Sequence, residues 1–325
     1  MRNDGLCLVD GAKIHEVVYR EVTIERTHFT GPDGCGRIRT TVNTPAGVLT
    51  ALDRPGGFTA WQPGGFTTWR EERLWKSEAD YEPLEALVQD RRYLPTYETF
   101  EARQRMLGGD SFPWVSMHYS PLLEILYDLM GIEQFSLQWA ENRGRLLHLY
   151  DVLLEDKRKL YPLAAESPAL LVQYCGNVMP EVVGLERFER YVLPAYNEAA
   201  EALHAHGKLL AVHLDANTGL LADAVARSSI DVIAAFTPAP TCDMTVAEAR
   251  AAWPDKALWI NFPSSVHLED VETVEAVARQ ILRESAPGER FIISITETVP
   301  EDRWAQNYAA ILRACREAGR LPIRA

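Results

Sequence analysis

Three side chains that can bind a metal follow two apolar runs of the chain. His213 and Asp215 come at the end of the run that starts at Lys208, and Glu297 follows the run Phe291–Ile295. Short apolar runs rich in β-branched residues are typical of buried parallel strands. The carboxyl ends of such strands carry the chemistry of α/β barrels. His213, Asp215 and Glu297 are therefore the first candidates for catalysis, since imidazole and carboxylate groups are both zinc ligands.

Polar and aromatic residues also follow the other predicted strands. Asn177 comes after Gly176, which allows a close approach of the backbone, and we expect its amide to hold a substrate oxygen or a metal-bound water. The residues predicted to contact the substrate are His118, Tyr119, Tyr174, Phe236, Asn261 and Phe262.

Each candidate also has a simpler structural interpretation. His213 could form a hydrogen bond within a packed barrel mouth, and Asp215 could cap the helix predicted over Thr218–Arg227. Glu297 could be a surface residue or could precede a helix capped by Thr298. Asn177 could belong to a Gly-Asn turn, and the aromatic residues could be ordinary core.

The elements that must position these residues alternate between strand and helix from about residue 112 onward. Amphipathic helices are predicted over Leu185–His206, Thr245–Trp253, Val271–Glu284 and Arg303–Ala318. The predicted strands are Pro113–Tyr119, Leu170–Cys175, Lys208–His213, Asp231–Phe236, Ala257–Phe262 and Arg290–Thr296. Repeated βα units predict a parallel sheet, but six strands are fewer than the eight of a closed (β/α)8 barrel.

The first part of the chain has a different pattern. Alternating runs and turn residues predict antiparallel strands over Val17–Phe29, Arg37–Val42 and Val48–Leu52, and helices over Lys76–Arg91 and Phe100–Gly108. We therefore divide the chain into residues 1–110, a β-ribbon and helical segment, and residues 111–325, the barrel. The first segment could cover the barrel, supply its missing strands, or pack as an arm onto a second subunit in a homodimer.

Composition excludes several classes of partner. The net charge is -13 over 325 residues, which argues against nucleic acid and anionic membranes as partners. No apolar run is long enough for a membrane span, and the amino terminus lacks an apolar signal core. The five cysteines have no metal-type spacing, so we expect a protein of the reducing cytoplasm that acts on a small molecule.

Several short motifs carry a resemblance to a known superfamily. The segment from Phe188 to Pro194, the His-Ala-His-Gly-Lys stretch at 204–208, and His213-Leu214-Asp215 match in order, followed by Thr237–Thr241, Asn261-Phe262-Pro263 and Thr296–Pro300. Over residues 110–320 the chain resembles the uroporphyrinogen decarboxylase superfamily. The resemblance implies a (β/α)8 TIM-type barrel and an activity such as decarboxylation or corrinoid-linked methyl transfer.

Two departures from the family pattern refine this expectation. The Arg-rich motif and the early catalytic Asp of the decarboxylases are missing, and the chain starts past the usual first strand. In the thiol-methylating members the metal ligands are His-x-Cys and a later Cys, whereas here the matching positions are His213, Asp215 and Glu297. A metal held by oxygen ligands is more electrophilic and suits an ether oxygen.

The resemblance therefore implies a metal-assisted methyltransferase of the O-demethylase type. It would use zinc or another divalent metal, and it would pass a methyl group from a methoxylated small molecule to a corrinoid on a carrier protein. The catalytic residues would be His213, Glu297 and Asn177. The alternatives are a metal-independent decarboxylase of a tetrapyrrole or another carboxylated substrate, and a non-catalytic barrel that binds a ligand or the corrinoid protein.

Overall fold

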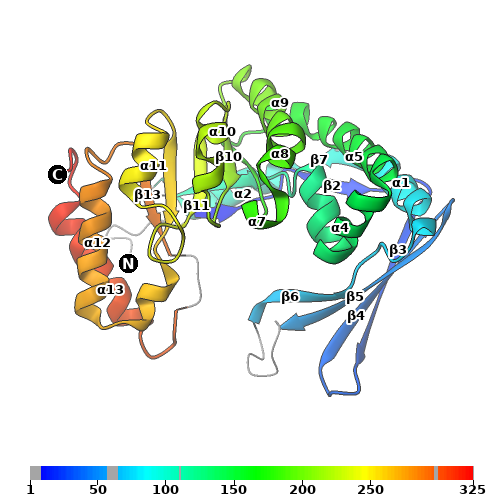
Figure 1. The fold of residues 1–325 in the computed structure, drawn as a ribbon, viewed down its shortest axis with the longest axis horizontal. Helices are drawn as coiled ribbons and strands as arrows, with labels where there is room; N and C mark the ends of the chain where they lie inside the picture. The colour runs from blue at the N-terminus through cyan, green and yellow to red at the C-terminus, as the bar shows by residue number, and fades with distance from the viewer. Residues whose placement is uncertain (1–8, 57–64, 110, 296–298, 325) are drawn as a thin grey trace. The chain divides into compact units, whose positions relative to one another are not determined.

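The computed structural model describes residues 9–56, 65–109, 111–295 and 299–324 (Figure 1). The chain forms two compact units. Unit 1 consists of residues 1–14, 96–119 and 161–325, and unit 2 consists of residues 15–95 and 120–160. Within the described residues, no helix has the length and apolar character needed to cross a bilayer.

Unit 1 is built on a parallel sheet of seven strands. Their order is β1 (Val9–Gly11), β8 (Phe112–Ser116), β9 (Leu171–Tyr174), β10 (Leu209–His213), β11 (Val232–Phe236), β12 (Ala257–Asn261) and β13 (Phe291–Ser294). The six predicted strands are all present, although the predicted Pro113–Tyr119 strand ends at Ser116. The seventh strand, β1, pairs in parallel with β8 and comes from the amino-terminal segment. The sheet is an incomplete (β/α)8 barrel, which confirms the predicted fold class.

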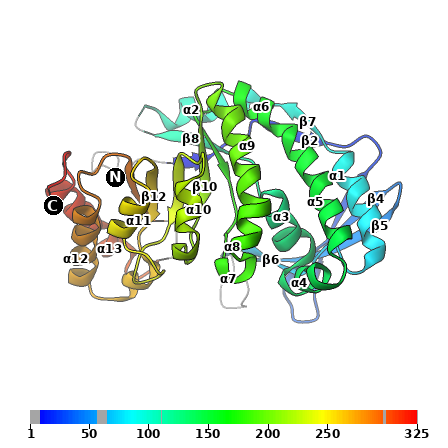
Figure 2. The same cartoon turned by 45° about the horizontal axis from the view of Figure 1, so that its top comes forward.

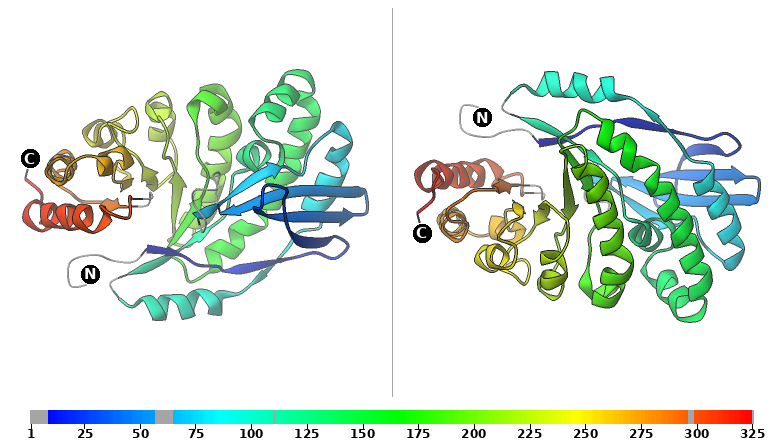
Figure 3. Two further views of the ribbon diagram at one scale, coloured as in Figure 1. Left: turned by 90° about the horizontal axis from the view of Figure 1, so that it is seen from below. Right: turned by 90° about the horizontal axis from the view of Figure 1, so that it is seen from above.

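Helices cover the outer side of this curved sheet (Figure 2, Figure 3). The Thr245 hydroxyl accepts a hydrogen bond from the Glu248 amide at 3.1 Å, so the predicted capping box begins α11. The helices of unit 1 are α2 (Tyr97–Leu107), α6 (Leu160–Glu166), α7 (Pro180–Val183), α8 (Leu185–Arg187), α9 (Leu193–His204), α10 (Ala222–Ala226), α11 (Val246–Ala252), α12 (Val271–Glu284) and α13 (Trp304–Ala318), with π-turns at η4 (Phe188–Val192) and 3₁₀ turns at η5 (Gly219–Leu221) and η6 (Ser264–Leu268).

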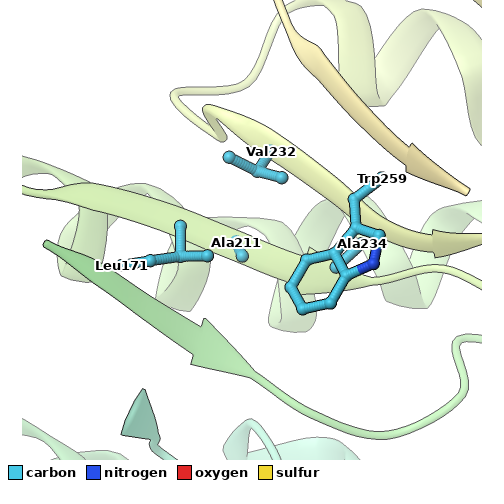
Figure 4. Close-up of a cluster of buried hydrophobic side chains, with 5 residues drawn as sticks. All are labelled: Leu171, Ala211, Val232, Ala234 and Trp259. Carbon is cyan, nitrogen blue, oxygen red and sulfur yellow. The ribbon is translucent and has the colours of Figure 1, made fainter. Parts of the chain in front are cut away.

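The inner face of the sheet carries an apolar layer of mostly small residues. Leu171, Ala211, Val232, Ala234 and Trp259 form one buried cluster (Figure 4). Side chains alternate between the faces of a regular strand, so the residues two positions away from these also face inward, except after Ala234, where the register shifts before Phe236. The small alanines leave room for the Trp259 indole to extend over the neighbouring strand.

Unit 2 contains the predicted β-ribbon and a group of helices. Its four-stranded antiparallel sheet has the order β3 (Thr23–Thr30), β4 (Gly36–Thr44), β5 (Gly47–Gly56) and β6 (Gly65–Glu72). A second pair joins β2 (His15–Val18) to β7 (Arg92–Pro95). The helical elements are η2 (Glu78–Asp80), α1 (Tyr81–Gln89), α3 (Pro121–Leu123), η3 (Glu124–Met130), α4 (Ile132–Glu141) and α5 (Arg143–Arg158).

A buried ionic cluster holds the helices of unit 2 to its short sheet. Glu124 forms ion pairs with Arg91 and Lys157, both at 2.9 Å. Asp156 accepts hydrogen bonds from Arg91 at 3.2 Å and from the Tyr93 hydroxyl at 2.7 Å. Because every charge in the cluster has an opposite charge beside it, the residues can remain ionised in the interior.

Candidate functional site

His213 and Asp215 lie together at the carboxyl end of β10. The His213 side chain faces inward, because it lies two residues beyond Ala211 of the inner cluster. Its Nε2 atom is 3.1 Å from Oδ2 of Asp215, and the two side chains are 27% and 18% exposed. Among the described residues, the buried Nε2 atom nevertheless has no hydrogen-bond partner, and neither has Oδ1 of Asp215.

Asp215 does not cap the helix that follows it. The backbone amide of Thr218 donates to Oδ1 of Asp243 at 2.9 Å, and the amide of Gly219 donates to Oδ2 of the same residue at 3.1 Å. Asp243, from the loop after β11, therefore satisfies the free amides at the start of η5 and α10. The capping role considered for Asp215 therefore belongs to Asp243. The Asp215 carboxylate does not bond to these amides.

A cysteine lies beside this pair, and its surroundings raise its pKa. The Cys242 thiol donates a weak hydrogen bond to the backbone oxygen of Asp215 at 3.5 Å. Burial raises the pKa of this thiol, and the carboxylates of Asp215, Asp243 and Glu181 raise it further.

The geometry of His213 and Asp215 fits two ligands of one metal ion. Ligands about 2.0–2.1 Å from a tetrahedral zinc ion lie roughly 3.3 Å from each other. The observed separation of 3.1 Å between Nε2 and Oδ2 is close to that value. Within the described residues, no group of three His, Cys, Asp or Glu side chains could hold a metal. Glu297, the predicted third ligand, lies outside the described residues.

A row of polar side chains faces inward at the ends of the neighbouring strands. The row consists of Ser116, Gln173, His213, Asn261 and Ser294. The Ser294 hydroxyl donates to the backbone oxygen of Ile260 at 2.9 Å and lies 3.4 Å from Oδ1 of Asn261. Asn261 thus faces the predicted site with its amide only partly satisfied.

Two further buried polar atoms on this face lack a partner. They are Oε1 of Gln173 and Nε1 of Trp259. In register, Gln173 pairs with Ala211, and Ala234 pairs with both His213 and Trp259, so both side chains belong to the strands around His213. Neither residue was among the sequence candidates. The sequence does contain a signal for them, because each is a single polar side chain in an otherwise apolar strand. Such groups are rarely buried without a hydrogen bond, so an isolated amide or indole in a buried strand indicates a partner.

Tyr119 approaches the backbone beyond β9 very closely. Gly176 has a φ of +96°, and a Cβ atom at this position would overlap the Tyr119 ring. The glycine predicted to allow a close approach therefore does so for Tyr119. Asn177 is exposed. His118 is also exposed, has a φ of +57°, and accepts a hydrogen bond from the Cys175 amide through its backbone oxygen at 2.9 Å.

Three predicted substrate contacts point away from the inner face. Tyr174 is buried, and its hydroxyl is 2.9 Å from that of Tyr161. Phe236 packs edge-on against Trp253 at a ring distance of 5.8 Å, and Phe262 packs against His267 at 5.1 Å. These side chains lie between the sheet and its helices, so we leave Tyr174, Phe236 and Phe262 out of the proposed site.

Comparison with known proteins agrees with this architecture. A solved structure of a methyltransferase from Methanosarcina mazei is similar, with a TM-score of 0.56 and 12% sequence identity, over 77% of this chain and 72% of that one. No curated protein sequence matches the chain. Residues 71–318 match the family described as uroporphyrinogen decarboxylase (URO-D), and this match covers most of the chain. The chain belongs to the uroporphyrinogen decarboxylase family.

Proposed function

We propose that this protein is a metal-assisted methyltransferase that removes the methyl group of a methoxylated small molecule. The acceptor would be a corrinoid carried by a partner protein. The family match and the fold shared with a methyltransferase support the reaction class. The observation that carries the proposal is the contact of 3.1 Å between Nε2 of His213 and Oδ2 of Asp215, together with the absence of a hydrogen-bond partner for Nε2 and for Oδ1 of Asp215 among the described residues.

Burying an imidazole nitrogen and a carboxylate side by side without a hydrogen bond is costly. An unsatisfied buried polar atom costs about 1–3 kcal/mol, and more if it is charged. A divalent cation bound by both atoms removes this cost, and Glu297 would supply a further oxygen ligand. Bound there, the metal supplies Lewis acidity at an ether oxygen, which helps that oxygen to leave with a negative charge.

The proposed reaction balances in atoms and charge. The bond between the methyl carbon and the ether oxygen would break as the methyl carbon forms a new bond to the acceptor, and the acceptor would supply the electron pair of the new bond. The electron pair of the broken bond stays on the oxygen, which then takes up a proton to become a hydroxyl group. His213 and Asp215 hold their positions throughout, and neither of them is consumed.

The ligand set favours an oxygen substrate over a thiol. Thiol activation is suited to thiolate-rich metal sites, in which the bound substrate is itself a nucleophile. Here the matching strand end carries Asp215. A carboxylate-rich site leaves the metal more electrophilic, which is the property that an ether oxygen requires.

The substrate would lie over the inward polar row. Tyr119, Gln173 and Asn261 are the proposed contacts, with His118 and Asn177 at the outer edge. Among the described inward residues at the carboxyl ends of β8 to β13, none is Arg or Lys. A polycarboxylated substrate would require such cations, so this part of the site suits a substrate of low charge.

Methyl transfer to a corrinoid tests the proposal. The wild type is supplied with Co(I) cobalamin and a panel of methoxylated aromatic compounds, and methylcobalamin is followed by its absorbance. We expect turnover in the wild type and a loss of at least about a hundredfold in His213→Ala, as expected for loss of a metal-positioning group. The control is His204→Ala, since Nε2 of His204 is 2.8 Å from Asp231 in an ordinary exposed pair. Equal activity in His213→Ala and His204→Ala would contradict the proposal.

A further inference from the structure

A separate cavity lies at the other end of the sheet in unit 1. Its volume is about 530 Å³, which is within the range of sites for small organic ligands. Residues near the amino ends of the strands line it, among them Phe112, Leu171, Val232, Ala257 and Phe291. His213 and Asp215 lie at the carboxyl ends, so this cavity is distinct from the proposed methyl-transfer site.

The inner face of the sheet near the cavity carries small side chains, and one of them, Ala257, lines the cavity. In a complete barrel, bulky branched residues fill the interior in layers. Here Ala211, Ala234 and Ala257 occupy inward positions on adjacent strands, and the sheet has seven strands. Trp259 fills part of this space and lines the cavity. Figure 4 shows its indole against the face that bears Ala234.

The wall of the cavity is strongly apolar and includes residues that face solvent. Leu170, Leu209 and Leu321 line it, and they are 64%, 37% and 64% exposed. Large aliphatic side chains gathered around a hollow leave apolar surface in water, and such patches on a soluble protein mark binding sites. An apolar molecule that entered the cavity would cover this surface.

A charged side chain, Arg290, lies at the edge of the cavity. Among the described residues that line the cavity, Arg290 is the charged one. Gln104 contributes a side-chain amide to the lining. Nη1 of Arg290 donates to the backbone oxygen of Asp255 at 2.8 Å, which fixes the guanidinium group. Its other nitrogens form no hydrogen bond with described residues. Arg250 lies near enough for the two positive charges to repel each other.

We propose that this cavity binds an amphipathic anion, whose apolar body fills the pocket while its carboxylate pairs with Arg290. A medium-chain carboxylate with about ten carbons matches both features, because the cavity of about 530 Å³ is lined mainly by apolar residues and Arg290 is the charged residue of that lining. The guanidinium group offers paired N–H donors to a carboxylate. This proposal does not depend on the proposed methyl transfer.

Calorimetric titration with decanoate tests the proposal, and decanol serves as the matched neutral ligand. We expect decanoate to bind the wild type, and Arg290→Gln to weaken its binding about tenfold, which corresponds to the loss of one charge-assisted hydrogen bond. Decanol should bind both proteins equally. Arg283→Gln, which removes an exposed charge from α12 that does not line the cavity, should leave decanoate binding unchanged.

A second variant tests the location of the apolar body. Ala257→Leu adds bulk inside the cavity and should weaken both ligands, with the folded state checked by its urea midpoint. Failure of decanoate to bind the wild type would overturn the proposal. Equal weakening of decanoate and decanol by Arg290→Gln would also overturn it, because the charge would then have no specific role.

Discussion

Nε2 of His213 lies 3.1 Å from Oδ2 of Asp215, and no hydrogen bond joins the two atoms. A second histidine and aspartate pair in unit 1 behaves differently. Nε2 of His204 and Oδ2 of Asp231 are 2.8 Å apart and form a hydrogen bond at the exposed end of α9. Among the described residues, the inward pair therefore leaves Nε2 of His213 without a hydrogen-bond partner, whereas the two atoms of the outer pair are hydrogen-bonded to each other.

Separate substitutions of Asp243 and Asp215 should distinguish helix capping from metal binding. Asp243→Ala removes the acceptor for the amides of Thr218 and Gly219 and should lower the free energy of unfolding by about 1 kcal/mol. Asp215→Asn should leave the stability of the metal-free protein within about 0.5 kcal/mol. Urea unfolding in the presence of a chelator measures both values. A larger loss in Asp215→Asn than in Asp243→Ala would show that we have assigned the cap to the wrong residue.

Gly176→Ala should disturb the site through Tyr119. The new Cβ atom would overlap the Tyr119 ring, and a φ of +96° is itself unfavourable for alanine. Gly207→Ala is the matched control, because Gly207 has a φ of +68° but nothing within 4 Å of its added Cβ. We expect the control to lose about 1 kcal/mol and Gly176→Ala to lose roughly 1–3 kcal/mol more. Urea unfolding checks this, and equal losses would mean that the ring moves aside freely.

Ala234→Leu should displace the indole of Trp259. Ala234 lies between His213 and Trp259 in the register of the sheet, and its small side chain leaves space for the indole. Overpacking at this position should cost about 1–3 kcal/mol and should change the tryptophan fluorescence. Ala247→Leu on the exposed face of α11 is the control and should be nearly neutral. Wild-type fluorescence and stability in Ala234→Leu would argue against the described packing.

Glu124 should stabilise unit 2 in a pH-dependent way. Burial alone would raise the pKa of Glu124, but the charges of Lys157 and Arg91 outweigh it and lower the pKa to about 2. A lowered pKa means that the stabilisation is present above the unfolded-state value of about 4.3. It is lost as the pH falls through the folded-state value, and its full size is on the order of 3 kcal/mol.

Replacement by a neutral amide tests this pH dependence. Glu124→Gln should be destabilised by about 3–5 kcal/mol at pH 7, since Lys157 and Arg91 lose their partner in the interior. The gap to the wild type should narrow between about pH 4 and pH 2. Glu189→Gln removes an exposed partner of Arg227 and should change stability by no more than about 1 kcal/mol. A gap that stays constant with pH would refute the assigned ionisation.

Much of the architecture follows from local patterns in the chain. The helix predicted over Val271–Glu284 has those bounds in the structure, because Asp270 caps it and its apolar spacing is regular. The strand Val9–Gly11 has three residues, too few to give a pattern.

The sequence predicts a site residue correctly only where its position at the end of a strand determines where its side chain lies. His213 and Asp215 follow a strand end, and the parallel sheet brings that end to the expected edge. The facing of Tyr174 and Phe236 was not predictable, because strands buried on both faces lack the alternation that marks the inner side. The capping role of Asp243 depends on a contact between two loops 24 residues apart in the chain, which local spacing does not reveal.

The metal content of the purified protein tests the central claim most directly. Wild type, His213→Ala, Asp215→Asn and the control His204→Ala are each equilibrated with zinc, passed through a desalting column, and analysed by elemental mass spectrometry. The account predicts about one zinc ion per chain in the wild type and the control, and little in the two site variants. Equal zinc in all four proteins, or none in the wild type, would contradict a metal site formed by His213 and Asp215.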